Sequence, residues 1–536
     1  MKRILIAFIG IFFLVSCGDQ LRFDQKQMAE DVTYKTSAKY LLSGSIDGIA
    51  QWYQSEGFKG DTYNAVVQYY QQLFSVKSQT YEEFAKAPAD WATEFNMLKP
   101  IKAGIDLSIE ENEPFIQGIF MVLKSFMFAH ITDKWGDIPY TEALEGRTGV
   151  FFPTFDTQQT VYEGMLADLD AAITLIEGAP NMSEPKFDLI YTGDKAKWVK
   201  FANSLKIRLL VRSYEAFKKA GVDNGAKLNA IVSSGKYFTS IGDNASYSYI
   251  GSANFNSWPM GYYNDNSKNE LTRRKPSTTF INALKNLDDP RLTGWIAPAL
   301  IPWATTPSTF EVTDRYGYTY TVNQQDISED TKGDADDYPV DELYVGMPIG
   351  YGEGNPVRFG GTVPAAGAYD NFRTSSFGAL FWEDKHDLLK MSLLLASEVN
   401  LNLAEAAQKG WITGSAKTFY DKGVTLSMER WAIPANEIIA YLANPLVNLD
   451  GTNNLEKIAT QKWFALFTVG VESYFEYRRT KLPSIIGAAV PTGLGNPFPD
   501  RYRYPTAEKD NNTEKYNEAV ARQGEDTQST KIWLLK

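Results

Sequence analysis

The feature that most constrains the fold of this chain is a series of long segments with apolar residues at helical spacing. Residues 196–219 place one residue of each turn on a single stripe: Trp198, Phe201, Leu205, Leu209 and Arg212. Further helices are predicted at residues 63–76, 113–132, 158–177, 387–409, 416–430 and 453–479. These helices come in pairs with short connections, which predicts a mainly α fold built from stacked helix hairpins of the tetratricopeptide type.

The middle of the chain has a different composition. Residues 240–380 hold 10 of the 24 prolines, together with frequent Gly, Asn, Tyr and Trp, and they contain few long helical patterns. This composition predicts a loop-rich region set into a helical scaffold formed by residues 37–239 and 381–536. Because binding groups are often carried on loops that a rigid scaffold positions, residues 240–380 are the predicted ligand-binding region.

The N-terminus has the organisation of an export signal. Basic residues at positions 2 and 3 precede an apolar run over residues 4–15, which is too short to cross a hydrocarbon core of roughly 30 Å. Leu14-Val15-Ser16-Cys17 resembles the lipobox of bacterial lipoproteins, which implies removal of residues 1–16 and acylation of Cys17. Since Cys17 is the only cysteine, it has no disulfide partner, and several acyl chains there would anchor the protein firmly to a membrane. Polar residues up to position 36 are the predicted tether.

Charge and composition limit the partners. The formal net charge is −12 and there is no basic block, which excludes nucleic acid as a probable class of partner. Aromatic residues make up 14% of the chain, so some of them are available as exposed stacking platforms beyond those needed in the core.

Five segments carry a family resemblance. They are KWGDIPYTEA at 134–143, WVKFANSLKIR at 198–208, SEVNLNLAEAA at 397–407, QKWFALF at 461–467 with EYRRT at 476–480, and PDRYRYP at 499–505. Together these segments resemble the SusD/RagB-like nutrient-binding outer-membrane lipoproteins of Bacteroidetes. The usual paired tryptophans at the end of this family are replaced by Ile532-Trp533-Leu534-Leu535-Lys536, for which we expect a changed local contact only.

The resemblance implies a fold, a location and a role. It implies one SusD-like domain over residues 37–536, with four tetratricopeptide-like helix pairs and the loop-rich part packed over them. It also implies a lipid-anchored protein on the outer face of the outer membrane, acting as a lid over a SusC-like TonB-dependent transporter. An oligosaccharide would be captured between lid and barrel without being cleaved. Capture of peptides is the alternative within the same family.

Several motif residues have a plain structural interpretation. Gly136 and Pro139 are expected to form the turn that ends a helix, and Asp137 is expected to cap backbone amides. Arg478 and Arg479 are expected to form ion pairs within their own helix, with Glu472 and Glu476.

Signals of catalysis are scarce. His130 and His386 form no HExxH motif, and the chain has no GxSxG elbow and no phosphate-binding loop. We therefore expect no metal site and no cofactor, although the acidic run at 330–337 leaves a structural calcium ion open as an alternative to a solvated turn. An α-helical glycoside hydrolase is the rival class, since two of the many carboxylates could lie roughly 5 to 10 Å apart across a cleft.

The predicted glycan site lies in and after residues 254–274. Sugars present apolar C–H faces and polar rims, so their sites combine flat aromatic rings with amide, carboxylate or guanidinium groups. The predicted ligand-binding residues are Trp258, Tyr262, Tyr263, Asn264, Asn266, Arg273, Trp295 and Trp303, with Asp265 as a further candidate hydrogen-bonding group. Tyr81 and Trp91 are weaker candidates. Trp258-Pro259 followed by a tyrosine pair favours a glycan over a peptide.

Overall fold

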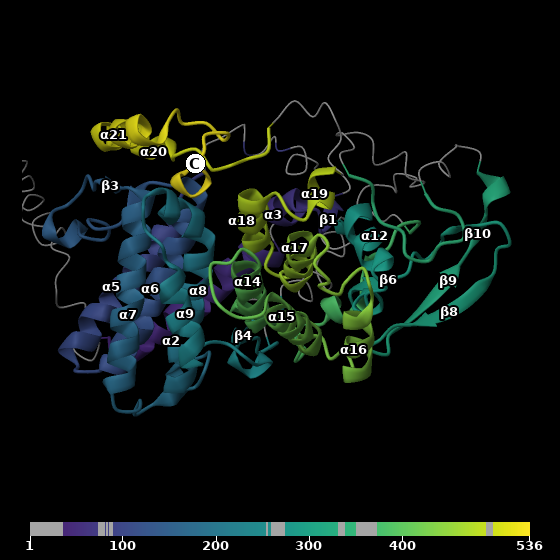
Figure 1. Ribbon diagram of the computed structural model, residues 1–536, viewed down its shortest axis with the longest axis horizontal. Coiled ribbons are helices and arrows are strands. Elements are labelled where there is room, and N and C mark those ends of the chain that lie inside the picture. Colours follow the sequence, from purple (N-terminus) through teal and green to yellow (C-terminus); the bar gives the residue numbers. More distant parts are fainter. Residues whose placement is uncertain are drawn as a thin grey trace, which may run out of the picture.

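A computed structural model gives the architecture of the protein (Figure 1). It describes residues 36–59, 61–72, 81, 84, 89–252, 256–258, 274–330, 338–349, 372–488 and 497–536. The fold is mainly helical, as the sequence predicts, and its strands are short. Cys17 and the tether lie outside the described residues.

The N-terminal half is a bundle of long helices, drawn in purple and blue in Figure 1. Its members are α2 (Ala38–Gln54), α5 (Ala92–Glu110), α6 (Pro114–Trp135), α7 (Gln158–Gly178), α8 (Lys195–Lys219) and the shorter α9 (Gly225–Ser234). Helices that follow one another in sequence pack together, α5 on α6, α6 on α7 and α7 on α8, while α2 packs on α5. This neighbour-to-neighbour packing is what stacked helix hairpins require.

The centre of this bundle is α6. By length and composition it is apolar enough to cross a membrane, yet 83% of its most apolar window is buried inside the protein, so it is a core helix. The helices approach one another closely because glycines face large side chains. A Cβ on Gly104 of α5 would lie 2.2 Å from the Phe120 ring, and one on Gly118 of α6 would lie 2.6 Å from Ile176. Both contacts would be severe clashes, so glycine is needed for this spacing.

The turn after α6 confirms the roles expected of Gly136 and Asp137, whereas Pro139 lies in the short strand β2 (Ile138–Pro139), which pairs with β3 (Phe155–Asp156). Gly136 follows the last residue of the helix with φ of 88°, a backbone conformation that favours glycine. Asp137 then accepts a hydrogen bond from the Gln158 backbone amide at the start of α7, at 3.0 Å. One carboxylate therefore connects the end of one core helix to the beginning of the next.

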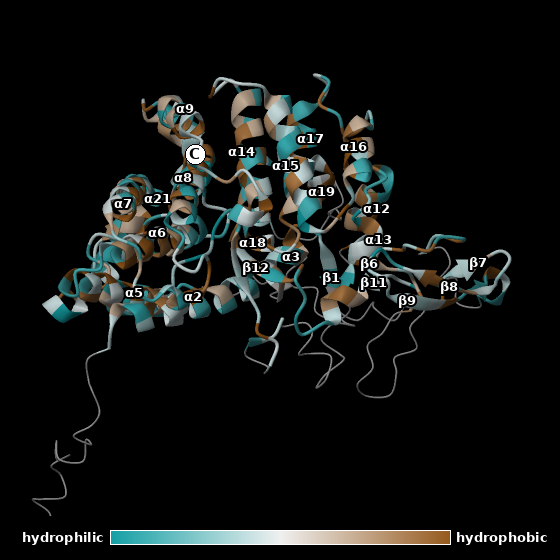
Figure 2. Cartoon of the chain, turned by 90° about the horizontal axis from the view of Figure 1, so that it is seen from below, coloured by the Kyte–Doolittle hydropathy of each residue, from teal (hydrophilic) through white to brown (hydrophobic). Residues whose placement is uncertain are grey.

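The C-terminal half supplies a second group of helices, drawn in green and yellow. These are α14 (Ala396–Gln408), α15 (Ala416–Arg430), α16 (Ala435–Ala443), α17 (Asn454–Ala465), α18 (Gly470–Thr480), α19 (Ser484–Ala488), α20 (Thr506–Asn511) and α21 (Thr513–Gln523). Figure 2 shows α14, α15 and α17 side by side next to the N-terminal bundle. Helix α8 contacts α14 and so joins the two halves.

Three predicted helices differ from the structure. Residues 387–409 contain strand β12 (Lys390–Leu394) before α14, since this segment pairs antiparallel with β4 (Ala245–Ser248). Residues 63–76 contain the end of the short helix α3 (Asp61–Val66) and then β1 (Tyr70–Gln72), which pairs antiparallel with β5 (Arg274–Pro276). Residues 453–479 form two helices, α17 and α18, instead of one. In the first two cases pairing with a distant strand overrides the local helical pattern.

The described part of the loop-rich region is built from short elements. They are β5 (Arg274–Pro276), α12 (Thr278–Asn286), α13 (Leu292–Trp295), β6 (Ile296–Ala297), β7 (Trp303–Ala304), β8 (Thr309–Thr313), β9 (Thr319–Asn323), β10 (Gln325–Asp326) and β11 (Ser376–Phe377). Strands β8 and β9 form an antiparallel hairpin that projects at the right of Figures 1 and 2.

Aromatic rings join this region to the C-terminal helices. The rings of Phe280 on α12 and Trp295 on α13 stack with centroids 5.9 Å apart, and Trp295 lies 4.7 Å from Phe467. Phe280 also packs edge-on against Trp463 of α17 at 5.4 Å. Phe280 and Trp295 thus belong to the main core, whereas Trp303 and Tyr338 form a separate, smaller core cluster within the loop-rich region.

Candidate functional site

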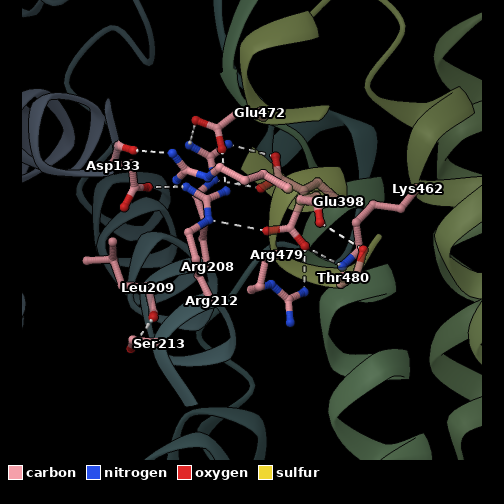
Figure 3. Close-up of polar contacts among 12 residues, drawn as sticks. Asp133, Arg208, Leu209, Arg212, Ser213, Glu398, Lys462, Glu472, Arg479 and Thr480 are labelled. Carbon is pink, nitrogen blue, oxygen red and sulfur yellow. Dashed lines mark hydrogen bonds and ion pairs between the residues drawn. The ribbon is translucent and has the colours of Figure 1, made fainter. Parts of the chain in front are cut away.

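The largest group of buried charges lies where the two halves meet (Figure 3). We call it the charge network; its carboxylates are Asp133, Glu398, Glu405, Glu472 and Glu476, and its cations are Arg208, Arg212, Lys462, Arg479 and the partly exposed Lys409. These residues come from α6, α8, α14, α17 and α18. Five carboxylates therefore face five cations, and all of these side chains except Lys409 are at most 9% exposed.

Arg208 and Arg212 of α8 organise one end of the network. Arg208 donates to both oxygens of Glu398, at 2.6 and 2.7 Å, and to Glu472 at 3.2 Å. Arg212 donates to Glu472 at 2.5 Å and to Asp133 at 2.6 Å. Burial alone would raise the pKa of Glu472, but the two guanidinium groups lower it to about 2. The carboxylate is therefore ionised at neutral pH.

Arg479 and Lys462 organise the other end. Arg479 donates to both oxygens of Glu405, at 2.8 and 2.7 Å, and to Glu476 of its own helix at 2.7 Å. Lys462 lies 2.8 Å from Glu405 and 3.0 Å from Glu476. The predicted ion pair within α18 is therefore present for Arg479 and Glu476.

Glu472 and Arg478, the other two residues expected to form ion pairs within α18, have partners outside that helix. Glu472 pairs with the α8 arginines, and Arg478 donates to the backbone oxygens of Asp133 and Asp500 at 2.7 and 2.9 Å. Each carboxylate of the network already has cationic partners, so we assign the network a structural role, which is to hold five helices together.

Three of the predicted ligand-binding residues are buried. The side chains of Trp258, Trp295 and Trp303 are 1%, 0% and 4% exposed. Trp258 packs against Phe58, with ring centroids 5.3 Å apart, and the Arg373 guanidinium lies 3.5 Å from the centre of the Trp303 ring. These three rings therefore stabilise the core in this structure and present no open face for stacking on a sugar, which corrects the role predicted for them.

The other predicted ligand-binding residues lie outside the described residues. They are Tyr262, Tyr263, Asn264, Asn266 and Arg273, and Asp265 lies there as well. Their contact with a ligand stays a prediction, as does a calcium ion in the acidic run, of which residues 331–337 are also outside the description. The weaker candidates Tyr81 and Trp91 are buried, at 4% and 5% exposed.

A cavity of about 410 Å³ combines aromatic rings with charged groups, and we call it the Lys134 pocket. Its walls come from the end of α2, the π-helical turn η2 (Ser55–Lys59), α3, the start of α5, the end of α6 and the C-terminal segment. The lining residues are Trp52, Ser55, Glu56, Thr62, Tyr63, Ala89, Asp90, Thr93, Glu94, Lys134, Trp135 and Tyr502.

Lys134 lies at the centre of this pocket, with a side chain only 5% exposed. Its Nζ is 2.6 Å from Glu56 Oε2 and 2.9 Å from Glu94 Oε1. The same ammonium lies 5.5 to 5.9 Å from the ring centroids of four aromatic residues, Trp52, Tyr63, Trp135 and Tyr502. The site already stabilises one ammonium by two carboxylates and by the negative faces of these rings.

The protonation states of the pocket follow from these contacts. Burial acts to raise the pKa of Glu56, but Lys134 and His130 lower it to about 2, so this carboxylate is ionised at neutral pH. Burial, and next the Lys134 charge, lower the pKa of His130, whose Nε2 is 3.4 Å from Glu56, so the imidazole is neutral. Burial raises the pKa of Tyr63 well above its ordinary value, so its hydroxyl keeps its proton.

These groups suit binding better than catalysis. The carboxylates of Glu56 and Glu94 accept hydrogen bonds, the Tyr63 hydroxyl donates one, and the rings offer flat apolar faces. A glycosidase needs one carboxylic acid that stays protonated, and the low pKa of Glu56 rules it out for that part. Within the described ranges, no group of three or more His, Cys, Asp or Glu side chains could hold a metal ion.

Two other cavities are less suitable. One of about 210 Å³ borders the charge network, whose polar groups already pair with one another. Another, of about 460 Å³, is lined by residues of α12, α15, α17 and α19 and by the segment between α16 and α17, and Tyr420, the one aromatic residue among its described lining, is fully buried. Four aromatic rings line the Lys134 pocket beside three carboxylates. The cavity at the charge network has two rings, Trp463 and Tyr477, and its carboxylates Glu405 and Glu476 are each already paired with more than one cation.

Lys134 begins the KWGDIPYTEA motif, but the predicted ligand-binding residues do not include it or the other residues of the Lys134 pocket. The sequence does contain one signal, because His130 and Lys134 lie one turn apart near the end of a mainly apolar helix. Their partners Glu56 and Glu94 lie on other helices, however, and no local pattern connects them to α6.

Comparison with known proteins assigns the chain to a protein family. A family model of the SusD-like type, described as starch-binding and associating with the outer membrane, matches residues 29–505. No curated protein matches the chain at a comparable level of significance.

Solved structures share the fold. A SusD homolog from Bacteroides fragilis is 23% identical with a TM-score of 0.74, covering 94% of this chain and all of that one. A chitin-binding protein is 24% identical with a TM-score of 0.68, covering 93% of this chain and 98% of that one. A chitin-binding SusD homolog from Flavobacterium johnsoniae is 19% identical with a TM-score of 0.66, covering 92% of this chain and 98% of that one.

Proposed function

This chain belongs to the SusD-like family, and from that premise we propose that it is a glycan-binding protein of nutrient uptake, with the Lys134 pocket as its ligand site. The observation that carries the proposal is the family match over residues 29–505, whose description combines starch binding with the outer membrane. Two proteins of the same fold are described as chitin-binding, which supports a glycan as the ligand class.

The chemistry of the Lys134 pocket supports the same ligand class. Fixed carboxylates accept hydrogen bonds from sugar hydroxyls, and Lys134 holds both of them in place through contacts of 2.6 and 2.9 Å. Trp52, Trp135 and Tyr502 provide the aromatic surfaces on which a sugar ring packs. A cavity of about 410 Å³ takes part of an oligosaccharide and leaves the remaining units outside.

The location and the partner form the second part of the proposal. Cys17 at the end of the lipobox is the attachment point of a lipid anchor in the outer membrane, with the protein facing the cell surface. There it acts as a lid over a SusC-like TonB-dependent transporter and passes the captured oligosaccharide to the channel. The protein binds its ligand and does not cleave it.

Isothermal titration calorimetry tests this function. The lipid-free protein, residues 18–536, is titrated with a glycan panel and a peptide panel, and each mixture is then analysed for cleavage products. Saturable binding of a glycan that stays intact is the expected result. Binding of peptides alone would overturn the ligand class, and cleaved products from a pure preparation would make the protein a hydrolase.

A further inference from the structure

The charges that line the Lys134 pocket do not balance. Among the described residues that line it, Glu56, Glu94 and Asp90 provide three carboxylates, whereas Lys134 is the one cation. His130, which lies behind Trp52 at 4.5 Å between ring centroids, adds no charge because burial keeps it neutral. The lining therefore carries a formal charge of about −2 in a site that is partly closed to water.

The distribution of these charges matters as much as their sum. Lys134 is shared between Glu56 and Glu94, each of which has further oxygen lone pairs. Asp90 is exposed at the rim, where its Oδ1 accepts a hydrogen bond from the Ala92 amide at 2.9 Å. A ligand that enters past Asp90 meets negative charge first at the rim and again at the floor.

The aromatic rings that line the pocket also favour a positively charged ligand. Four rings already surround the Lys134 ammonium at 5.5 to 5.9 Å, which shows that the walls of this pocket tolerate a cation. A second ammonium would gain from the unmatched carboxylates, whereas a ligand carboxylate or sulfate would be repelled by them. A neutral hydroxyl or acetamide gains hydrogen bonds only.

We propose that the Lys134 pocket selects glycans that carry protonated amines, such as glucosamine oligomers, over neutral glycans, and that it excludes uronic acids and sulfated sugars. This inference rests on the proposed function, since it assumes that the pocket receives a glycan. Glu94, with a side chain 5% exposed at the floor, and Asp90 at the rim are its specificity-determining residues.

The test compares oligomers that differ in charge. Chitotetraose, its fully deacetylated form and tetragalacturonate are titrated into residues 18–536 at low ionic strength and near pH 6, where the sugar amine is protonated. Deacetylated tetramer should bind about tenfold tighter than chitotetraose, because hydrogen bonds to charged groups are stronger than neutral ones. Tetragalacturonate should not bind, and the preference should shrink as salt is added.

Two substitutions test whether the carboxylates of the pocket cause the preference for the deacetylated tetramer. Glu94→Gln and Asp90→Asn keep the shape of the side chains, and asparagine can still cap the start of α5. Each should reduce the preference for the deacetylated tetramer about threefold or more. Glu518→Gln removes a partly exposed charge on α21, outside the pocket lining, and should leave the preference unchanged. Unfolding midpoints confirm that each variant is folded.

The outcomes separate the two proposals. Equal affinity for the acetylated and deacetylated tetramers, or tight binding of tetragalacturonate, would overturn the charge selectivity while leaving glycan binding intact. A preference that Glu518→Gln lowers as much as Glu94→Gln does would assign it to the net charge of the protein, not to the pocket. If no glycan binds, whatever its charge, the proposed function is wrong, and the charge selectivity that depends on it is wrong as well.

Discussion

The charge network and the Lys134 pocket differ in how completely their buried charges are paired. In the charge network five carboxylates meet five cations, and the bonds run between five helices. Among the described residues that line the Lys134 pocket, of about 410 Å³, one cation stands against three carboxylates and contacts two of them, Glu56 and Glu94. Charges that pair with one another stabilise a fold even where a cavity borders them, whereas carboxylates that outnumber the cations beside a cavity leave bonding capacity for a ligand.

Arg212→Ala should break the network with the largest effect. The change leaves Asp133 and part of Glu472 without a cation in the interior, which typically costs about 3–5 kcal/mol of the free energy of unfolding. Urea unfolding followed by circular dichroism measures it. The exposed Arg147→Ala is the control, with a change within about 0.5 kcal/mol. Equal effects for both variants would contradict a structural network.

Trp295→Ala should cost about as much, at about 3–4 kcal/mol, because it empties a core position against Phe280 and Phe467. Glycan affinity of the folded fraction should hardly change. The same unfolding assay and a titration at low temperature give both values. Normal stability with lost binding would instead place Trp295 in the ligand site.

Acid should weaken the network as its carboxylates are protonated. The pKa of Glu472 is lowered from 4.5 to about 2, so its stabilising contribution is complete above pH 4.5 and is lost as the pH falls toward 2. The loss from this one group is on the order of 2–3 kcal/mol. Unfolding free energies measured between pH 7 and pH 3 should fall more steeply for the native protein than for Arg212→Ala, in which part of that pairing is already gone.

Lys134→Met should have the smallest effect on stability of these changes. It leaves both Glu56 and Glu94 without their cation, but both carboxylates line the cavity, where water can solvate them, so we expect a loss of about 1–2 kcal/mol. Glycan affinity should fall because the carboxylates lose their fixed positions. A loss of stability as large as that of Arg212→Ala would mean that the pocket is another closed network.

The sequence predicts the helices well where a single apolar stripe decides the structure. Residues 416–430 match α15, and residues 196–219 match α8 (Lys195–Lys219) within one residue. The prediction is wrong for residues 387–394, because β12 is stabilised by β4 from a distant part of the chain. A local pattern contains no information about such a partner.

The ligand site was harder to predict, for a related reason. Trp295 lies in a proline-rich segment, whose composition predicts exposed aromatic rings. The Phe467 ring that buries it comes from the turn between α17 and α18, far along the chain. For Lys134, the sequence suggests no binding role, although the residue lines a pocket. Its partners Glu56 and Glu94 come from other helices, so no single motif contains the pocket. Burial and charge pairing are properties of the tertiary structure.

A crystal structure of residues 18–536 with a bound glycan tests the central claim most directly. The account predicts an intact oligosaccharide in the Lys134 pocket, with hydroxyl or amine groups on Glu56 or Glu94 and a sugar ring packed on Trp52, Trp135 or Tyr502. A glycan bound by the loop-rich region at Tyr262 and Tyr263, with the Lys134 pocket empty, would contradict it and return the site to residues 254–274.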